Sequence, residues 1–222
     1  IRDLRMSRGL GDVYKRQLRN NIPIEEKSAA RKRLGLPDCL TILSAGGSQG
    51  ASRLNEAVVQ LLAYEQKKGN INHIHGYGKH GRDTFMQSLA DNGVDAGNPH
   101  FIIKEYIDNM YTCMCASDLI ITRAGAMTLT EITAIGRASV LIPYPYAAEN
   151  HQYYNALTLQ NANAGRIIDD KELTGSVLID TVNRLADDPE LLRLMSENAA
   201  KLSKRDAAGI ILREITELMG IK

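Results

Sequence analysis

From residue 36 onward, short apolar runs alternate with longer stretches in which apolar residues recur every three or four positions. The short runs are typical of buried strands, and the recurring positions are typical of amphipathic helices. The runs predict six strands, at residues 40–43, 71–75, 101–103, 119–121, 139–142 and 166–168. The recurring positions predict helices at 54–62, 83–89, 108–115, 128–135 and 150–161, and two or three more between residues 175 and 219. Asp108 is the predicted N-cap of the third of these helices, and Gly136 is expected to end the fourth.

Strands that alternate with helices form βαβ units and therefore a parallel sheet. We expect an α/β fold with a Rossmann-like, doubly wound parallel sheet. Such sheets bind ligands in the crevice at the carboxyl ends of their strands, so functional residues are expected in the loops that follow strands. Four of these loops carry glycine-rich or polar segments.

The first segment, at residues 46–50, lies between the first predicted strand and the first predicted helix. Glycines such as Gly47 let backbone amides approach a phosphate, and the following helix N-terminus adds partial positive charge. Ser48 adds a hydroxyl donor beside Gln49. The segment matches neither the G-x-G-x-x-G fingerprint nor a Walker loop. It predicts either a phosphate contact or only a tight turn between strand and helix.

The second segment, at residues 123–131, follows the strand at 119–121. Its small residues at 124–126 allow close approach of the backbone at the start of a helix. Glu131 has two interpretations. Thr128 and Glu131 have the spacing of a capping box, but a carboxylate beside a phosphate loop also suits the two neighbouring hydroxyls of a ribose. Arg123 is a candidate cation for a diphosphate.

The third segment, at residues 149–155, is the amide-rich start of a helix. The side chains of Gln152 and Asn155 can both donate and accept, which suits sugar hydroxyls, although a solvated helix start explains them equally well. His151 is expected to be a surface residue rather than a catalyst. In the fourth segment, the backbone of Ile107 either reads the edge of a base or simply closes an apolar strand end.

Composition and charge restrict the class of function. The chain has 222 residues, of which 44% are hydrophobic and 24% charged, and this usage excludes a disordered or low-complexity chain. The net charge is +1 and only residues 1–35 are basic, so the general basic character of a nucleic-acid-binding protein is lacking. No apolar run is long enough to predict a membrane span.

The reactive side chains give no metal or nucleophile signature. Cys39, Cys113 and Cys115 provide neither a disulfide framework nor a zinc-binding pair, so we expect buried thiols and a reducing cytoplasm. The sequence has no carboxylate cluster for a metal ion. A diphosphate must then be bound by helix N-termini, backbone amides and Arg123, so we expect metal-independent chemistry without a cofactor.

Together, the four segments resemble the MurG family of bacterial UDP-N-acetylglucosamine transferases, in its second, nucleotide-sugar-binding half. The resemblance is carried by GGSQGASRLNE at 46–56, EYIDNMYTCMCASDLIITRAGAMTLTEI at 105–132, HQYYNA at 151–156 and Asp-Ala-Ala at 206–208. These segments occur in the family's order and at similar distances. The resemblance covers about residues 18–222.

The resemblance implies that the chain is the C-terminal domain of a GT-B glycosyltransferase, in which two Rossmann-like domains face each other across a cleft. Such an enzyme transfers N-acetylglucosamine from UDP-N-acetylglucosamine to undecaprenyl-diphospho-muramoyl-pentapeptide, with inversion, and so makes lipid II for peptidoglycan. The intact parent is expected in the cytoplasm, peripheral on the inner face of the membrane, with no nucleic-acid partner.

Carried over by position, the resemblance gives each segment a role. Ile107 binds the uracil through its backbone, Glu131 holds the ribose hydroxyls, and Gln152 reads the sugar hydroxyls. The diphosphate is expected against Ser48 and a helix start formed by Ala126, Met127, Thr128, Leu129 and Thr130. The further candidates beside these are Gly47, Gln49, Arg123, His151 and Asn155.

The chain departs from the family at two positions. The family's linker motif has the form Gly-x-Pro-x-Arg, whereas residues 21–25 read NIPIE, which puts Glu25 in place of an arginine near the donor. A negative charge there is expected to weaken diphosphate binding. His151 stands where many relatives have Gln. We expect residues 1–17 to be a non-native extension, 18–35 a remnant of the interdomain linker, and 36–222 the UDP-sugar-binding domain.

The family's first domain, which carries the acceptor loop, the proposed catalytic base and the membrane-contacting patch, has no counterpart in the sequence. An inverting transfer needs a base and a firmly held acceptor. We therefore expect this chain alone to bind the UDP-sugar weakly, with little or no transferase activity and no catalytic residue of its own. Two alternatives stay open: a non-catalytic UDP-sugar-binding module, and a UDP-sugar epimerase of similar architecture.

Overall fold

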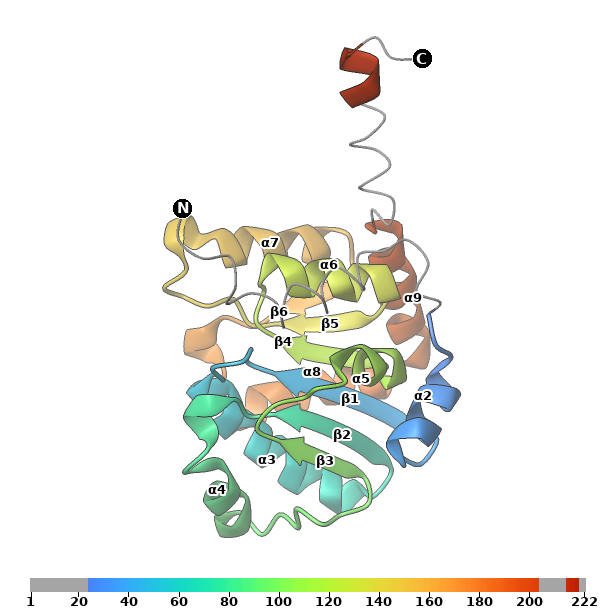
Figure 1. Ribbon diagram of the computed structural model, residues 1–222. Coiled ribbons are helices and arrows are strands. Elements are labelled where there is room, and N and C mark those ends of the chain that lie inside the picture. Colours follow the sequence, from blue (N-terminus) through green and yellow to red (C-terminus); the bar gives the residue numbers. More distant parts are fainter. Residues whose placement is uncertain (1–23, 204–214, 220–222) are drawn as a thin grey trace, which may run out of the picture. The chain divides into compact units, whose positions relative to one another are not determined.

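The computed structural model describes residues 24–203 and 215–219. Residues 25–202 form one compact unit. The sheet and the helices that cover it lie in this unit (Figure 1). The predicted extension at 1–17 and the Asp-Ala-Ala segment at 206–208 lie outside the described residues.

The described chain contains one sheet of six parallel strands. The strands are β1 (Leu40–Ala45), β2 (Ile71–Gly76), β3 (Phe101–Lys104), β4 (Leu119–Thr122), β5 (Ala138–Leu141) and β6 (Gly165–Ile167). Their order is β3-β2-β1-β4-β5-β6, and every neighbouring pair is parallel. This is the Rossmann strand order, so the predicted α/β class and doubly wound sheet are confirmed.

Helices cover both faces of the sheet (Figure 1). The first face is covered by α3 (Ser52–Lys68), α4 (Phe85–Asp91) and α8 (Gly175–Ala186). The second face is covered by α2 (Lys27–Leu34), α5 (Met110–Ala116), α6 (Ala126–Ile135) and α7 (His151–Asn161). Helix α9 (Pro189–Lys201) contributes side chains to both hydrophobic clusters.

The strands are apolar on both sides because each side faces a layer of helices. Ile42 belongs to the cluster under α3 and α8, whereas its neighbour Leu43 belongs to the cluster under α5 and α6. Successive strand side chains point to opposite faces, so a parallel strand covered twice reads as a continuous apolar run. This explains why the strand ends differ from the predicted ones by only one or two residues.

Helix starts were predicted less well than strands. Asp108 was expected to cap α5, but the N-cap residue is Asn109, and it makes no side-chain capping bond. The prediction is wrong because the chain makes a further turn at Asp108 and Asn109 before the helix begins. Gly136 ends α6 as expected, in a left-handed conformation with φ of 69°.

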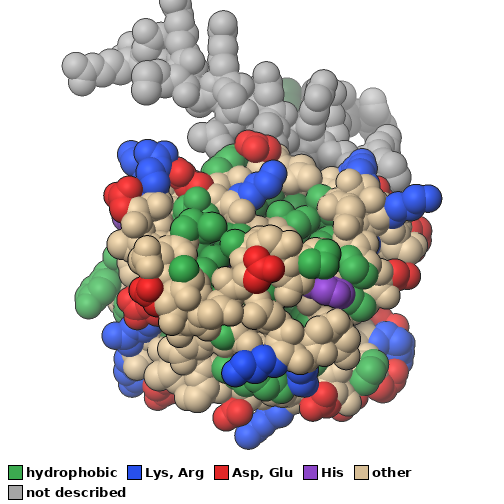
Figure 2. Space-filling view, turned by 90° about the horizontal axis from the view of Figure 1, so that it is seen from below, with side chains coloured by type: hydrophobic (Ala, Val, Ile, Leu, Met, Phe, Trp, Pro, Cys, Tyr) green, Lys and Arg blue, Asp and Glu red, His purple; other side chains and the backbone are tan. Residues whose placement is uncertain are grey.

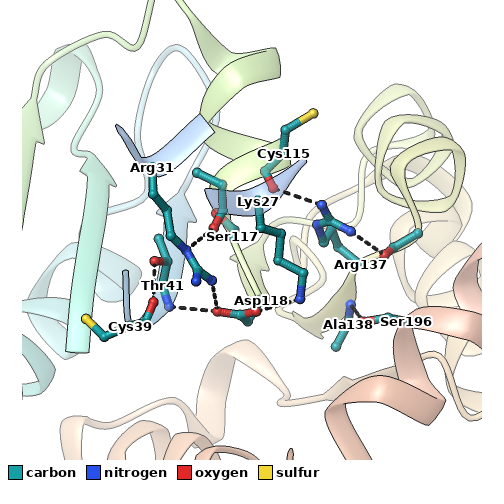
Figure 3. A network of polar contacts seen from close by, with 12 residues as sticks. Lys27, Arg31, Cys39, Thr41, Cys115, Ser117, Asp118, Arg137, Ala138 and Ser196 are labelled. Atoms are coloured by element: carbon teal, nitrogen blue, oxygen red, sulfur yellow. Dashed lines mark hydrogen bonds and ion pairs between the residues drawn. The ribbon is translucent and has the colours of Figure 1, made fainter. Parts of the chain in front are cut away.

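Helix α2 is held against the sheet by a network of charged side chains (Figure 3). The carboxylate of Asp118, between α5 and β4, accepts from Lys27 Nζ at 2.7 Å, from Arg31 Nη2, and from the Thr41 amide at 2.9 Å. Arg31 Nε also donates to the Ala116 carbonyl at 3.1 Å. A helix predicted to be part of the linker remnant is therefore anchored to the same compact unit as the sheet.

The position of the missing family arginine is locally neutralised. The Glu25 carboxylate accepts from Arg33 Nη2 at 2.7 Å, and Arg33 also contacts the Thr112 hydroxyl of α5. Glu25 therefore takes part in the packing of α2 on α5. Whether its charge affects ligand binding stays a prediction.

Two general properties of the surface bear on function. On the face drawn in Figure 2, acidic and basic side chains are interspersed with apolar ones. Among the described helices, none is both long enough and apolar enough to cross a membrane.

The three cysteines are free thiols. Cys113 and Cys115 are buried and Cys39 is partly exposed, so the prediction of buried thiols is confirmed for two of the three.

Candidate functional site

The candidate site lies where the strand order of the sheet reverses, between β1 and β4. These strands are neighbours, with Ala45 opposite Thr122 at their carboxyl ends. From this pair the chain continues outward to β2 and β3 on one side and to β5 and β6 on the other. The loops after β1 and β4 therefore run to opposite sides, and in sheets of this kind the crevice between two such loops is the usual ligand site.

The loop after β1 is a tight turn with an exposed tip. The Gly50 amide donates to the Gly47 carbonyl at 3.0 Å, and both glycines have positive φ, 89° for Gly47 and 85° for Gly50. The side chains of Ser48 and Gln49 are exposed and make no hydrogen bond to the described residues. The turn thus presents its polar tip to solvent, as the phosphate interpretation requires.

A third glycine, Gly78, supports this turn and was missed in the sequence. A Cβ on Gly78 would lie 2.2 Å from the Gly50 nitrogen, and φ of Gly78 is +71°. The following amides, of Lys79 and His80, donate to the carbonyls of Ser48 and Gln49 at 3.2 and 2.8 Å. The signal in the sequence was a glycine two residues beyond the strand at 71–76.

Helix α6 begins at the carboxyl edge without a side-chain cap. Its N-cap is Gly125, and its first internal bond runs from the Leu129 amide to the Gly125 carbonyl at 3.1 Å. The amides of Ala126, Met127 and Thr128 therefore have no partner in the helix. The capping-box interpretation of Thr128 with Glu131 is wrong, because the helix already begins two residues before Thr128.

Helix α3 offers a second uncapped start at the same edge. Its N-cap is Ala51, which makes no side-chain cap, and its first internal bond runs from Asn55 to Ala51 at 2.9 Å. Two sets of free amides thus follow the neighbouring strands β1 and β4. Both carry partial positive charge from their helix dipoles, which favours an anion between them.

Glu131 is partly buried one turn into α6 and lacks a partner. Among the described residues, none donates a hydrogen bond to its carboxylate or forms an ion pair with it. Burial alone raises the pKa of Glu131 above its usual value. A carboxylate that loses water without gaining a donor is unfavourable, so the position suits a ligand that brings hydroxyl donors.

The neighbouring side chains of α6 are already satisfied. Thr130 Oγ1 donates to the Ala126 carbonyl at 2.9 Å, and the Leu129 side chain is buried in the core beneath the helix. The side chains of Leu129 and Thr130 therefore have fewer unpaired polar groups for a ligand than the three free amides that precede them. Their predicted contacts remain predictions.

Arg123, the candidate cation, is engaged within the protein. Its Nη1 donates to the Asp170 carboxylate at 2.6 Å and to the carbonyls of Ile142 and Pro143 at 3.2 and 3.4 Å. Its guanidinium carbon lies 5.6 Å from the centre of the Tyr144 ring. This side chain links the loop before α6 to the loop after β5.

Two amide side chains of α7 brace the loops around the crevice. Gln152 Oε1 accepts from the Tyr144 amide at 3.0 Å, and Asn155 Nδ2 donates to the Ala124 carbonyl at 3.2 Å. His151 is exposed, and its Nδ1 lies 2.8 Å from the carbonyl of Ala148. The Gln152 amide nitrogen keeps its donors for a ligand, whereas Asn155 has used one donor on the loop.

Ile107 lies beyond the end of β3 with its side chain buried against Gly76. In the described part of the chain, no hydrogen bond uses its backbone amide or carbonyl. Both groups therefore lack a hydrogen-bond partner among the described residues. Their use by a base stays a prediction.

The site therefore combines three kinds of group. Two uncapped helix starts and a glycine turn can bind a diphosphate, an unpaired carboxylate can accept from a diol, and amide groups can read polar edges. The described residues hold no group of three or more acidic, His or Cys side chains placed to bind a metal ion.

Comparison with known proteins gives one family. The model of the glycosyltransferase family 28 C-terminal domain matches residues 41–210. A Desulforamulus reducens protein named UDP-N-acetylglucosamine–N-acetylmuramyl-(pentapeptide) pyrophosphoryl-undecaprenol N-acetylglucosamine transferase is 38% identical over 183 residues, which are 82% of this chain and 49% of that protein. A protein of the same name from Clostridioides difficile is 36% identical over 202 residues, covering 90% of this chain and 48% of that protein.

Solved structures agree with these relatives. The crystal structure of Acinetobacter baumannii MurG superposes with a TM-score of 0.71 at 29% identity, covering 88% of this chain and 54% of that one. The glycosyltransferase WaaG, at a TM-score of 0.58 and 22% identity, shares the fold. The chain spans about half the length of the curated relatives that it matches.

Proposed function

Because this chain belongs to the glycosyltransferase family 28 C-terminal domains, we propose that it is the donor-binding half of a longer glycosyltransferase. The proposed reaction is the transfer of N-acetylglucosamine from UDP-N-acetylglucosamine to the lipid-linked muramoyl-pentapeptide. The names of the relatives support this donor and this acceptor. The intact parent is proposed to work on the inner face of the cytoplasmic membrane.

The observation that carries the proposal is the unpaired Glu131 carboxylate behind the uncapped start of α6. A diphosphate alone would be repelled by this carboxylate, whereas a nucleoside diphosphate brings two ribose hydroxyls that can donate to it. The free amides of α6 and the glycine turn then bind the diphosphate on the same side of the sheet.

We assign the remaining groups from their positions. Ser48 and the amides of residues 126–128 bind the diphosphate, and the Ile107 backbone binds the uracil. Gln152 reads the sugar from beside the loop after β5, and Asn155 holds the loop before α6. Helix dipoles and backbone amides supply the positive potential, so the proposed transfer is independent of a metal ion. The resemblance to the MurG family further implies that the proposed transfer inverts the anomeric centre.

The general base and the acceptor site are assigned to the other half of the parent. No residue of the candidate site is placed as a catalytic base, because Glu131 is assigned to the ribose. We therefore expect the chain by itself to bind the donor without appreciable turnover.

Calorimetric titration of the full chain with UDP-N-acetylglucosamine and UDP-glucose tests the proposal. We expect binding in both cases and tighter binding of the N-acetylated sugar. Glu131→Ala should weaken binding by about 1.5–3 kcal/mol, the value of a hydrogen bond to a charged group.

Glu56→Ala is the matched control, since Glu56 is an exposed carboxylate near the start of α3. Equal losses in both variants would remove the ribose role of Glu131. No binding by the unsubstituted chain at millimolar ligand would contradict the proposed function of the chain.

A further inference from the structure

Asp170 lies between two arginines that come from different sides of the crevice. Its carboxylate accepts from Arg123 Nη1 at 2.6 Å and lies 3.9 Å from Arg53 Nε, and its backbone carbonyl accepts from Arg53 Nη1 at 2.8 Å. The side chains of Asp170 and Arg123 are 15% and 14% exposed, whereas Arg53 is half exposed. The Asp170–Arg123 pair is thus largely withdrawn from water.

The three residues join segments that are far apart in the sequence. Arg53 lies in the first turn of α3, and Arg123 lies just before the start of α6. Asp170 begins the short helix η4 (Asp170–Glu172) after β6, which is separated from β4 by β5. The segment after β6 therefore reaches back to the point where the strand order reverses, where it contacts α3 through Arg53 and the loop just before α6 through Arg123.

The contacts of Arg123 indicate a structural use of its charge. Its Nη1 carries two hydrogens and already has three acceptors, the Asp170 carboxylate and the carbonyls of Ile142 and Pro143. Since Asp170 neutralises it within the protein, Arg123 adds little net positive charge for a phosphate. The same guanidinium lies over the ring of Tyr144. The backbone amide of Tyr144 donates to the side chain of Gln152.

We propose that Asp170 is a positioning residue that sets the spacing between the starts of α3 and α6, and thereby the fit of the diphosphate between them. Asp170 itself does not touch the ligand. The physical reason is preorganisation: donors that are fixed before binding lose less conformational entropy when the ligand arrives. This inference rests on the proposed function, because it takes the ligand between the two helices to be a diphosphate.

The test compares ligands with and without phosphates. UDP is titrated by calorimetry, and uridine is titrated by NMR chemical shifts, into the full chain and its Asp170→Asn variant. We expect Asp170→Asn to weaken UDP binding about tenfold or more, comparable to the loss of a charged hydrogen bond. Uridine affinity should change by less than about twofold, because uridine has no phosphate to bind the free amides at the two helix starts.

Asp118→Asn provides a matched control at the opposite end of the strands. Asp118 is also 15% exposed, and it pairs with Arg31, which is 10% exposed (Figure 3). Both variants are expected to lower the urea midpoint of unfolding. Only Asp170→Asn is expected to change the ratio of UDP to uridine affinity, which a purely stabilising role would leave unchanged.

Three outcomes would overturn the inference. UDP affinity that Asp170→Asn leaves unchanged would show that the pair does not position the site. Tighter UDP binding would show instead that Arg123 is a phosphate ligand restrained by Asp170. Equal weakening of UDP and uridine would indicate general loss of structure.

A second variant keeps the test decisive if Asp170→Asn fails to fold. Arg53→Ala removes the half-exposed partner and should give a smaller loss of UDP affinity, again without a loss for uridine; no selective loss would overturn the inference. Failure of the unsubstituted chain to bind UDP would overturn the proposed function and this inference together. UDP binding that is insensitive to both variants would overturn only the inference.

Discussion

Glu131 has no partner among the described residues, in contrast to two other carboxylates near the carboxyl edge of the sheet. Asp170 is paired with Arg123, and Glu105 forms two short bonds with Arg82. Glu105 has a lowered pKa because Arg82 donates to it, whereas burial raises the pKa of Glu131. The protein therefore carries an unfavourable charge at Glu131 that a bound diol would relieve.

Glu131→Gln should stabilise the free chain near neutral pH. Because the folded pKa is raised, the folded protein binds this proton more tightly than the unfolded chain does, and this contribution is lost as pH rises through the folded pKa. We expect the variant to have the higher unfolding free energy at pH 7 and no advantage near pH 4. Urea unfolding across this range measures the difference.

The exposed Glu56 serves again for comparison, since Glu56→Gln should leave the pH profile unchanged. A less stable Glu131→Gln variant at pH 7 would mean that the carboxylate has a stabilising partner. The combination of higher stability and weaker nucleotide binding is what a ligand-binding role predicts.

At the scale of elements, the glycine turn after β1 depends on the loop after β2. The positive φ of Gly78 and its approach to Gly50 leave no space for a side chain. This contact explains how the two loops pack without burying unpaired backbone groups, because the Lys79 and His80 amides bond to the turn. A local pattern cannot reveal it, since the partner loop lies on another strand.

Gly78→Ala should therefore displace the turn as well as strain the backbone. Gly78 has φ of 71° and ψ of 172°, a conformation that is essentially restricted to glycine and costs another residue about 1–3 kcal/mol, and overpacking adds about 1–3 kcal/mol. We expect a loss of about 2–6 kcal/mol in unfolding free energy, together with weaker UDP binding.

Gly93→Ala separates strain from displacement. Gly93 has a similar φ of +69°, but a Cβ there would meet nothing within 4 Å. The Gly93→Ala variant should lose only about 1–2 kcal/mol of unfolding free energy and should keep its UDP affinity. Equal effects of the two substitutions on binding would show that the contact between Gly50 and Gly78 does not shape the site.

At the scale of the whole molecule, a buried polar chain crosses the first face of the sheet. Ser44 Oγ lies 2.7 Å from His73 Nε2 and 2.7 Å from His75 Nδ1, and His73 Nδ1 lies 2.7 Å from Glu65 Oε2. His75 Nε2 has no partner among the described residues. Burial, with a smaller effect of His73, holds the pKa of His75 well below its usual 6.5.

This lowered pKa predicts acid sensitivity of the fold. The unfolded chain binds a proton at His75 as pH falls below about 6.5, whereas the folded chain does not, so stability is lost at up to about 1.4 kcal/mol per pH unit. His75→Phe removes this proton and should flatten the profile of unfolding free energy between pH 7 and pH 5. The ring of His75 stacks on Phe85 with 4.7 Å between the ring centres, and a phenylalanine ring at this position can keep that stacking.

His80→Asn is the corresponding control, because His80 is exposed and should leave the acid profile as it is. If the His75→Phe variant is as sensitive to acid as the unsubstituted chain, the responsible proton binds elsewhere in the molecule.

The sequence by itself determined the elements, their order and the edge of the sheet where ligand groups gather. Strand runs and helix spacings are local patterns, and parallel strands bring the loops after them to one edge. This is why Ser48, Glu131 and Gln152 could be selected before their positions were known. The resemblance to the MurG family depended on the same local segments.

Only the tertiary structure decided how side chains pair across that edge. Arg123 looked like a phosphate ligand, but it pairs with Asp170, 47 residues away, and Arg53 reaches the same residue over 117 positions. Glu131 had the spacing of a cap, but α6 starts earlier and leaves the carboxylate alone. Such pairings depend on the paths of loops from different strands, and periodicity along the chain carries no information about those paths.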